Sequence, residues 1–430
     1  MGIGLRRASA TLLSAGLIGS ALLVASGPTA GAATTTTTST TSTTFTKAKV
    51  VSGLDDSEPG IDVAPDGTLY INAIGGLPTP PANVWRSSNA GSSWTLLPED
   101  TKAAAPGGGD ADIAVDPTDG SLYETDLWLG DSTASVSHDK GQTWLANPIQ
   151  GLPVQDRQWV ASSGGGIVYH AVHQIPAGIV VSKSVGGLVY PVSSEAATPL
   201  DQTGCICPPG NLIAEGGSGP AGTSDKVGVI YATSIGGVNF AQSTDGGLTF
   251  TNVAVSPANA NADPTTNFPV VANAGGGKLA AVWTEIVGNR SRIRFASSKN
   301  WGSTWSAPKT LISAGTSVFP WVAAKGSKIA VSLYHTSAVG TPDTVPNSAL
   351  WYEQLTESLN GGATFTTPVT ADPTPVKKGV ICTSGINCSG GRELGDFQQV
   401  ALDRAGRANM SYNRSVDNVS DVEVRFVREA

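Results

Sequence analysis

Apolar and polar residues alternate along short segments of this chain, and the segments come in pairs separated by a tight turn. Residues 60–73 read GIDVAPDGTLYINA, in which two alternating segments flank an Asp-Gly turn. The same arrangement recurs at residues 111–128, 268–285 and 397–413. Alternation with a period of two predicts strands that turn one face toward a core, and the intervening turn residues predict β-hairpins. A third and a fourth strand-like segment follow these hairpins, so we predict an all-β fold.

An eight-residue motif, S-x-[DN]-x-G-x-[ST]-[WF], separates the third and fourth predicted strands. Its copies begin about 50 to 60 residues apart, except for one gap of about twice that length. The segment SKSVGGLVY at residues 182–190 fills that gap as a degenerate copy without the acidic residue. The five clear copies are SSNAGSSW at residues 87–94, SHDKGQTW at 137–144, STDGGLTF at 243–250, SKNWGSTW at 298–305 and SLNGGATF at 358–365.

Each position of the motif has a physical role in a turn. The acid or amide accepts bonds from backbone N–H groups, and the glycine takes a positive φ that a side chain would resist. The final aromatic ring is expected to pack between neighbouring sheets. A single active site does not need five copies, so we interpret the acid or amide of each copy as structural. These residues are Asn89, Asp139, Asp245, Asn300 and Asn360.

The motif and its spacing resemble those of the Asp-box (BNR repeat) β-propellers, the superfamily that contains the sialidases. The resemblance covers about residues 45–430 and implies four-stranded antiparallel blades with the Asp-box turns on one face. Hairpins that begin near residues 58, 111, 157, 211, 268, 318 and 396 predict seven blades, or six if the degenerate third blade is misassigned. The last blade has three strands and no motif, so we predict that residues 43–52 supply its fourth strand and close the ring.

The first 44 residues differ in composition from the rest of the chain. Arg6 and Arg7 precede an apolar stretch and an Ala-Gly-Ala sequence at residues 30–32, which predicts a secretory signal peptide over residues 1–32. A membrane anchor is the alternative, but the apolar stretch is short and ends in Gly27-Pro28. Residues 33–44 are rich in Thr and Ser and predict a disordered linker before the propeller at 45–430. We therefore expect a secreted protein, extracellular or associated with the cell envelope, with no membrane span in the mature chain.

The net charge of the chain limits the kinds of partner that it is expected to bind. The chain has 26 Lys and Arg against 34 Asp and Glu, a formal net charge of −8, and no basic cluster. Nucleic-acid binding needs clustered cations that displace counterions, so a nucleic-acid partner is not expected. The partner we expect is an extracellular carbohydrate or a component of the cell envelope, bound by a monomer.

Four cysteines suit an oxidising compartment, where an even number favours disulfides. Cys205 and Cys207 lie in GCICPPG, and Cys382 and Cys388 lie in ICTSGINCSGG. A bond between Cys205 and Cys207 would close a very small ring, so we expect the two segments to be joined by one of the two remaining pairings. A zinc site is the minor alternative.

Polar residues near the start of two innermost strands are the first candidates for chemistry. Asp156, Arg157 and Trp159 precede the third hairpin, and Arg392, Glu393 and Asp396 precede the seventh. A guanidinium there would hold a carboxylate or sulfate through two parallel hydrogen bonds. The alternative is an Asp–Arg pair that only ties neighbouring blades together.

The ends of the second strands bring further polar and aromatic residues to the same predicted face. Three of the four histidines fall there, and they either transfer protons or make hydrogen bonds at blade edges. No cofactor is required by these residues, but calcium is possible beside Asp55, Asp56, Glu58, Asp110 and Asp112, unless these are solvated loop carboxylates. The residues at the strand ends are Tyr123, Glu124, Asp126, Tyr169, His170, His173, Trp283, Glu285, Arg290, Arg292, Tyr334, His335, Tyr412 and Arg414.

The resemblance implies a sialidase-like exo-glycosidase, in which three arginines hold the substrate carboxylate, a Tyr helped by a Glu is the nucleophile, and an Asp is the acid/base. This chain departs from that pattern, since no arginine lies between Arg7 and Arg86 where the first of the three is expected. Whether it is an enzyme is therefore left open. The alternatives are a non-catalytic propeller that binds glycan or protein and a polysaccharide lyase-like enzyme with His170 or His173 as base. The candidate catalytic residues are Arg157, Arg392, Asp396, Tyr412 and Glu285, and the candidate ligand-binding residues are Asp156, Trp159, His170, His173, Arg292, Tyr334 and Arg414.

Overall fold

The computed structural model describes residues 43–75, 81–98, 107–198, 209–265, 268–416 and 421–430. The predicted signal peptide and most of the predicted linker lie outside the described residues, as do Cys205 and Cys207. Residues 43–430 form one compact unit. No helix in the described ranges is long and apolar enough to cross a membrane.

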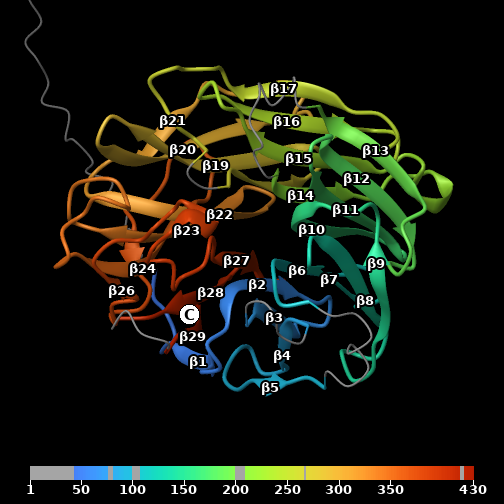
Figure 1. Ribbon diagram of the computed structural model, residues 1–430, viewed down its shortest axis with the longest axis horizontal. Coiled ribbons are helices and arrows are strands. Elements are labelled where there is room, and N and C mark those ends of the chain that lie inside the picture. Colours follow the sequence, from blue (N-terminus) through green and yellow to red (C-terminus); the bar gives the residue numbers. More distant parts are fainter. Residues whose placement is uncertain (1–42, 76–80, 99–106, 199–208, 266–267, 417–420) are drawn as a thin grey trace, which may run out of the picture. The chain divides into compact units, whose positions relative to one another are not determined.

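The described residues form seven antiparallel sheets arranged around a central axis (Figure 1). The innermost strands contact one another in order around the ring, which makes each sheet one blade of a propeller. Blades 1 to 3 consist of β2 (Ser57–Val63), β3 (Leu69–Ile74), β4 (Asn83–Ser87) and β5 (Thr95–Leu96); β6 (Ala111–Val115), β7 (Leu122–Trp128), β8 (Asp131–Ser137) and β9 (Leu145–Gln150); and β10 (Gln155–Gly164), β11 (Ile167–Gln174), β12 (Gly178–Val185) and β13 (Val192–Ala197).

The remaining blades repeat the same order from the axis outward. Blade 6 carries an extra short strand that pairs with β24. Blades 4 to 7 consist of β14 (Pro209–Glu215), β15 (Lys226–Ala232), β16 (Val238–Ser243) and β17 (Thr251–Ser256); β18 (Val270–Gly275), β19 (Lys278–Val287), β20 (Arg290–Ser298) and β21 (Lys309–Ile312); β22 (Thr316–Lys325), β23 (Lys328–Thr336), β24 (Leu350–Ser358), β25 (Val369–Thr370) and β26 (Lys377–Lys378); and β27 (Gln399–Leu402), β28 (Ala408–Arg414), β29 (Glu423–Arg428) and β1 (Lys49–Ser52). Two short 3-10 helices, η2 (Pro220–Gly222) and η3 (Gly385–Asn387), lie in loops.

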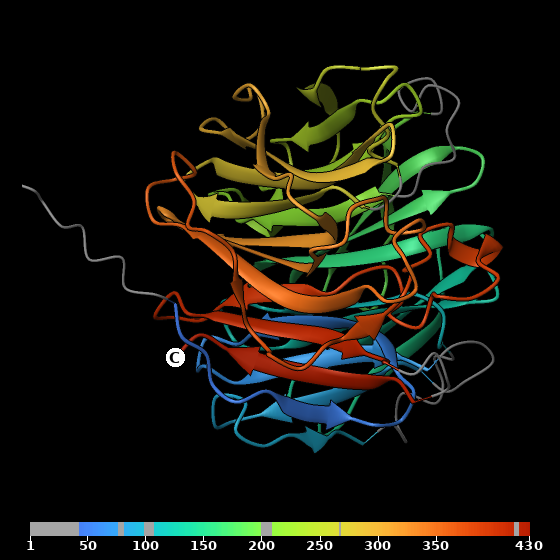
Figure 2. The same ribbon diagram turned by 90° about the vertical axis from the view of Figure 1, so that its left-hand side faces the viewer.

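The N-terminal strand closes the ring, as the sequence predicts. β1 pairs antiparallel with β29, and Phe45 forms a further bridge with Glu429. In both views the blue strand β1 lies beside the red strands of blade 7 (Figure 1 and Figure 2). The prediction of seven blades is confirmed, and the six-bladed alternative is wrong because residues 155–197 form a complete blade 3.

Polar side chains of the innermost strands tie each blade to the next around the axis. Asp62 accepts the backbone N–H of Val115 at 2.8 Å, and Asp112 accepts that of Val160 at 2.9 Å. Burial raises the pKa of Asp62 to about 6 and that of Asp112 to about 7, since removal from water disfavours the charged form. These residues line a cavity of about 320 Å³ in the channel between the innermost strands.

The five sequence motifs form turns with the same hydrogen bonds. In the second copy, Asp139 accepts the backbone N–H of Thr143 at 2.9 Å, and the Ser137 hydroxyl accepts the N–H of Gly141, whose φ is 82°. These turns join third to fourth strands and therefore lie at the same end of each blade as the turns between first and second strands. The opposite face carries the loops that enter the innermost strands and those between second and third strands.

Candidate functional site

A pocket of about 490 Å³ lies at the mouth of the central channel, on the face opposite the motif turns. Its walls come from the loops that enter the innermost strands of blades 1, 2, 3 and 7, together with the loop that enters blade 5 and part of the 382–388 loop. The pocket therefore lies where loops of several blades, far apart in the chain, come together. The charged and aromatic residues that line it are Glu58, Asp110, Asp156, Arg157, Phe268, Arg392 and Asp396.

Arg157 is the buried centre of the pocket, with a side chain that is only 2 % exposed. Its Nη2 lies 3.0 Å from Glu58 Oε2 and 2.5 Å from Asp110 Oδ1, so one nitrogen bridges blades 1, 2 and 3. The guanidinium carbon also lies 5.0 to 5.2 Å from the ring centres of Trp159, Phe268 and Phe397, a distance typical of cation–π contacts. Its Nε and Nη1 have no hydrogen-bond partner among the described residues.

Two of these charged residues lie at strained backbone positions. Arg157 has a φ of 51° and Glu58 a φ of 55°, and each lies at a bulge where the innermost strand shifts register against the second strand. A side chain at positive φ costs about 1–3 kcal/mol and persists only where the surrounding structure fixes it. Phe319 repeats this geometry in blade 6 with a φ of 51°. Bulges re-aim side chains, and here Arg157 and Glu58, which both lie at bulges, come within 3.0 Å of each other.

Two carboxyl groups compete for the single charge of Arg157, and this sets their protonation. Desolvation by burial raises the pKa of Glu58 to about 8 against the attraction of Arg157. The same desolvation raises the pKa of Asp110 to about 6, with added repulsion from Asp156 and Asp396 and a side-chain hydrogen bond to Asp156. One guanidinium neutralises one carboxylate, so the pair titrates as a unit that holds a proton near neutral pH.

Arg392 and Asp396 form the opposite wall. Arg392 donates to both carboxylate oxygens of Asp396, at 3.2 Å and 2.6 Å. The backbone N–H of Asp396 donates to Glu58 Oε1 at 3.1 Å, which places this turn directly against Glu58. Gly395 makes that approach possible, because a Cβ there would lie 2.3 Å from Glu58 Cγ.

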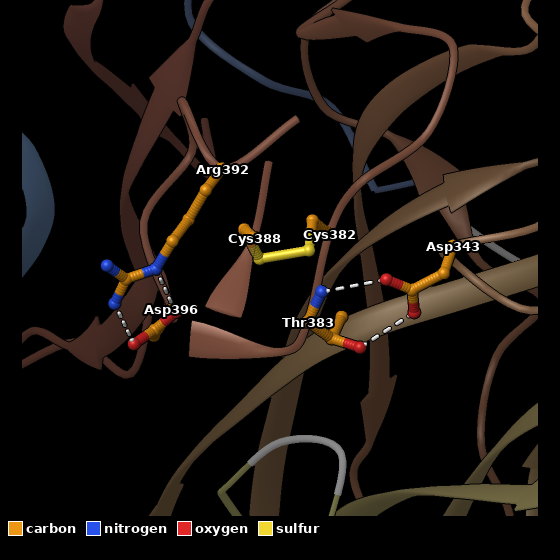
Figure 3. Close-up of a disulfide and its surroundings, with 6 residues drawn as sticks. All are labelled: Asp343, Cys382, Thr383, Cys388, Arg392 and Asp396. Carbon is orange, nitrogen blue, oxygen red and sulfur yellow. Dashed lines mark hydrogen bonds and ion pairs between the residues drawn. A yellow bond between two sulfur atoms is a disulfide. The ribbon is translucent and has the colours of Figure 1, made fainter. Parts of the chain in front are cut away.

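The segment between β26 and β27 carries this wall and a disulfide (Figure 3). Cys382 and Cys388 are bonded to each other, with their Cα atoms 5.9 Å apart. The prediction that they pair with Cys205 and Cys207 is therefore wrong, since the loop of five residues between Cys382 and Cys388 brings these two cysteines together. Thr383 anchors this ring to blade 6 by donating its backbone N–H and its hydroxyl to Asp343, at 3.0 Å and 2.8 Å. Ser384 and Gly385 of the ring line the pocket.

The structure gathers only part of the predicted site. Arg157, Arg392, Asp396 and Asp156 line the pocket, and Trp159 packs against the Arg157 guanidinium. Glu285 instead pairs with Arg292 on β19 and β20 of blade 5, at 2.5 Å. The predicted residues that do not line the pocket are Trp159, Glu285, Arg292, Tyr334, Tyr412, Arg414, His170 and His173.

The phenols and histidines are buried between blades. Tyr412 donates to Asp372 at 2.7 Å, and Tyr334 accepts the N–H of Asn413 at 2.9 Å, so both pack at the boundary of blades 6 and 7. His170 lies 3.1 Å from the Thr125 hydroxyl, and desolvation lowers its pKa to about 4. His173 lies opposite Asp156 in the pairing of β10 with β11, and desolvation lowers its pKa as well.

The acidic stretch near blades 1 and 2 does not form a metal site. Asp56 accepts bonds from Ser52 and Asn83, Asp112 accepts one from Val160, and the Glu58 and Asp110 carboxylates face Arg157. Within the described ranges, no three His, Cys, Asp or Glu residues are grouped so as to hold a metal ion. The oxygens that a calcium ion would need already accept protein donors. The donor set therefore does not fit that ion.

Sequence reasoning missed the roles of Glu58 and Asp110, which it considered only as calcium ligands. Their position was informative, because Glu58 is the second residue of β2, as Asp156 is of β10, and Asp110 comes directly before β6. Four carboxyl groups in the pocket outnumber the two arginines, and both arginines already contact carboxylates. The pocket is therefore acidic and has no arginine reserved for an anionic ligand.

Comparisons with known proteins support the architecture. No protein-family profile and no curated protein sequence matches the chain. Among solved structures, the GH74 enzyme of Niastella koreensis aligns with a TM-score of 0.51 and 19% identity over 85% of this chain and 52% of that one. A PL25 ulvan lyase aligns with a TM-score of 0.50 and 12% identity over 87% and 95% of the two chains. An α-L-arabinofuranosidase of Fusarium graminearum aligns with a TM-score of 0.47 and 12% identity, over 90% and 96%.

The likenesses to the GH74 enzyme and to the ulvan lyase show the propeller fold. At such identities they do not show a shared reaction, since one fold hosts many functions. The function has to be argued from the pocket.

Proposed function

We propose that this chain is a secreted, carbohydrate-active propeller of the Asp-box type that hydrolyses a glycosidic bond of an uncharged sugar in the channel-mouth pocket. One observation carries the proposal. Asp110 and Asp396 line the same pocket in different electrostatic surroundings, because Asp110 shares Arg157 with Glu58, whereas Asp396 has a two-bond pair with Arg392. Two carboxyl groups whose environments differ in this way are the usual machinery of glycoside hydrolysis.

Asp110 is the proton donor in this proposal. Its pKa is raised to about 6 by burial and by repulsion from Asp156 and Asp396, so it holds a proton to higher pH than an ordinary aspartate. Its side chain is 17 % exposed, whereas that of Glu58 is 3 % exposed, so Asp110 is the member of the pair that reaches a substrate. Glu58 is a positioning residue that shares Arg157 with it.

Asp396 is the second carboxylate. Arg392 fixes its orientation through both oxygens, and the side chain is 20 % exposed toward the pocket. The transition state of glycoside hydrolysis carries positive charge at the sugar ring, which a carboxylate stabilises. Asp396 faces that charge while Asp110 protonates the leaving oxygen.

The charge of the pocket selects against acidic sugars. A sialidase needs arginines free to hold the substrate carboxylate, but Arg157 contacts Glu58 and Asp110, and Arg392 contacts Asp396. An added carboxylate would meet an excess of like charge. Phe268 is only partly buried and gives the pocket an apolar surface for a sugar ring.

A non-catalytic binding propeller is the second candidate. The burial of Arg157 favours this candidate. Its ion pairs with Glu58 and Asp110 join blades 1, 2 and 3, as an ion network that only stabilises the fold would. In that case the pocket binds a glycan and leaves it intact.

Hydrolysis of a panel of neutral nitrophenyl glycosides and one sialoside separates these possibilities. We expect turnover of a neutral glycoside and a loss of at least about 100-fold in kcat for Asp110→Asn and Asp396→Asn. Asp119→Asn changes a carboxylate in the β6–β7 turn, at the opposite face, and should leave kcat unchanged. Binding of neutral oligosaccharides without turnover by the folded protein would favour the second candidate, and turnover of the sialoside alone would contradict the charge argument.

A further inference from the structure

A groove of about 770 Å³ lies between blades 5 and 6, at the face that carries the motif turns. It is formed by the β18–β19 turn, the end of β20, the start of β21, the β22–β23 turn and the blade 6 motif turn. The two blades are joined along it, since the N–H of Gly326 donates to the carbonyl of Ala274 at 2.8 Å. The groove is larger than the channel-mouth pocket and lies at the opposite end of the blades.

The charge of this groove is opposite to that of the protein as a whole. Lys278, Lys299 and Lys309 line it, and no Asp or Glu does. None of the three forms an ion pair with a carboxylate in the part of the chain that the structure describes. In a chain with a net charge of −8, three unneutralised ammonium groups in one groove favour an anionic ligand.

The groove is built before any ligand arrives. Lys309 Nζ donates to the carbonyls of Gly362 and Ala363, the latter at 2.9 Å, and so spans from blade 5 to blade 6. The same nitrogen lies 5.3 Å from the ring centre of Phe295. Gly362 packs directly on that ring, because a Cβ there would lie 2.4 Å from Phe295 Cζ. These contacts fix the spacing of the two walls.

The other residues that line the groove indicate that the anionic ligand is a glycan. The floor is apolar, formed by Leu279, Ala280, Phe295 and Ile329. Hydroxyl and amide side chains surround it, which suits a ligand with many hydroxyl groups. These polar side chains belong to Ser297, Ser298, Ser306, Ser327 and Asn360.

We propose that this groove binds an anionic polysaccharide whose carboxylate or sulfate groups contact Lys278 and Lys299. The sugar rings lie between the two lysines and the wall fixed by Lys309. Since the groove and the channel-mouth pocket open at opposite ends of the blades, both can be occupied at once. The groove therefore holds the protein on an acidic polymer, independently of any reaction at the pocket.

Affinity electrophoresis in gels that contain polygalacturonate, with dextran as the neutral comparison, tests this proposal. We expect retardation by polygalacturonate and none by dextran, and a fall in affinity as sodium chloride rises. Lys278→Glu combined with Lys299→Glu should weaken binding at least about tenfold. Hydrolysis at the channel-mouth pocket, if the parent shows it, should be unchanged in this double variant.

Lys47→Glu combined with Lys49→Glu is the matched control, because it changes the net charge equally at the N-terminal strand. Equal weakening by this control would overturn the proposal, since binding would then follow net charge alone. Absence of retardation by polygalacturonate in the parent would overturn it as well. Poly-glutamate that binds as tightly as polygalacturonate and displaces it would overturn the assignment to a glycan.

Discussion

The two faces of the propeller differ in which partners their polar side chains contact. At the motif turns, each acid or amide accepts nearby N–H groups of its own turn, and the arrangement repeats in five blades. At the channel mouth, the charged groups come from different blades, occur once each, and include strained residues and unpartnered donors on Arg157. Repetition marks groups that stabilise the fold, whereas a unique and costly arrangement marks a candidate site.

Removing Arg157 should produce the largest change in stability. Arg157→Met leaves the Glu58 and Asp110 carboxyl groups buried without their cation, and breaking such a pair costs about 3–5 kcal/mol. Urea unfolding monitored by tryptophan fluorescence measures the loss. Arg86→Met, which removes a guanidinium that donates to the Lys140 carbonyl at the other face, should change the free energy of unfolding by less than about 0.5 kcal/mol.

A combined variant distinguishes the ion network from simple packing around Arg157. If Glu58→Gln and Asp110→Asn are added to Arg157→Met, most of the lost stability should return, because no uncompensated carboxylate remains. An Arg157→Met variant as stable as the parent would contradict the electrostatic description of the channel mouth.

A smaller effect is expected at a motif turn. Asp139→Ala removes the acceptor for the N–H groups of Gln142 and Thr143 and should lower the free energy of unfolding by about 1 kcal/mol. Asp139→Asn should retain most of that stability, since asparagine occupies the same position in three other copies. Neither variant should alter activity at the opposite face. A change in kcat with Asp139→Ala, at unchanged stability, would contradict the division between the two faces.

The difference between the motif-turn face and the channel-mouth face explains how much of each could be predicted from the sequence. The blades, their number and the closure by β1 could be read from the sequence, because alternation and turn residues act locally and repeat. The pocket could be read only in part. Arg157, Arg392 and Asp396 were placed by their position near the start of innermost strands. Tyr412 and Glu285 were placed by their position at the ends of second strands, but Tyr412 is bonded to Asp372 between blades 6 and 7, and Glu285 pairs with Arg292 within blade 5.

The Cys382–Cys388 disulfide and the shared contact of Glu58 and Asp110 with Arg157 could not be predicted from the sequence, for a related reason. Both depend on distances between segments that are far apart in the chain or on the path of an irregular loop. Nothing in the spacing of Cys382 and Cys388 excluded a partner elsewhere, and nothing local shows that Glu58 and Asp110 contact the same nitrogen.

The pH dependence of stability tests the channel mouth most directly. The pKa of Glu58 is about 8 in the folded chain and 4.5 as its ordinary value, so between these pH values the folded chain holds a proton that the unfolded chain releases. The contribution of Glu58 to the free energy of unfolding is therefore fully present below about pH 4.5 and falls until about pH 8. Glu58→Gln cannot release this proton, so its urea midpoint should fall less steeply than that of the parent between pH 5 and pH 8.

Asp66→Asn is the matched control, because Lys140 lowers the pKa of that exposed carboxyl to about 2 and its titration lies below this window. Parallel pH profiles for the parent and Glu58→Gln would mean that Arg157 keeps Glu58 ionised, and the proton near neutral pH would then have to reside on Asp110, the proposed donor.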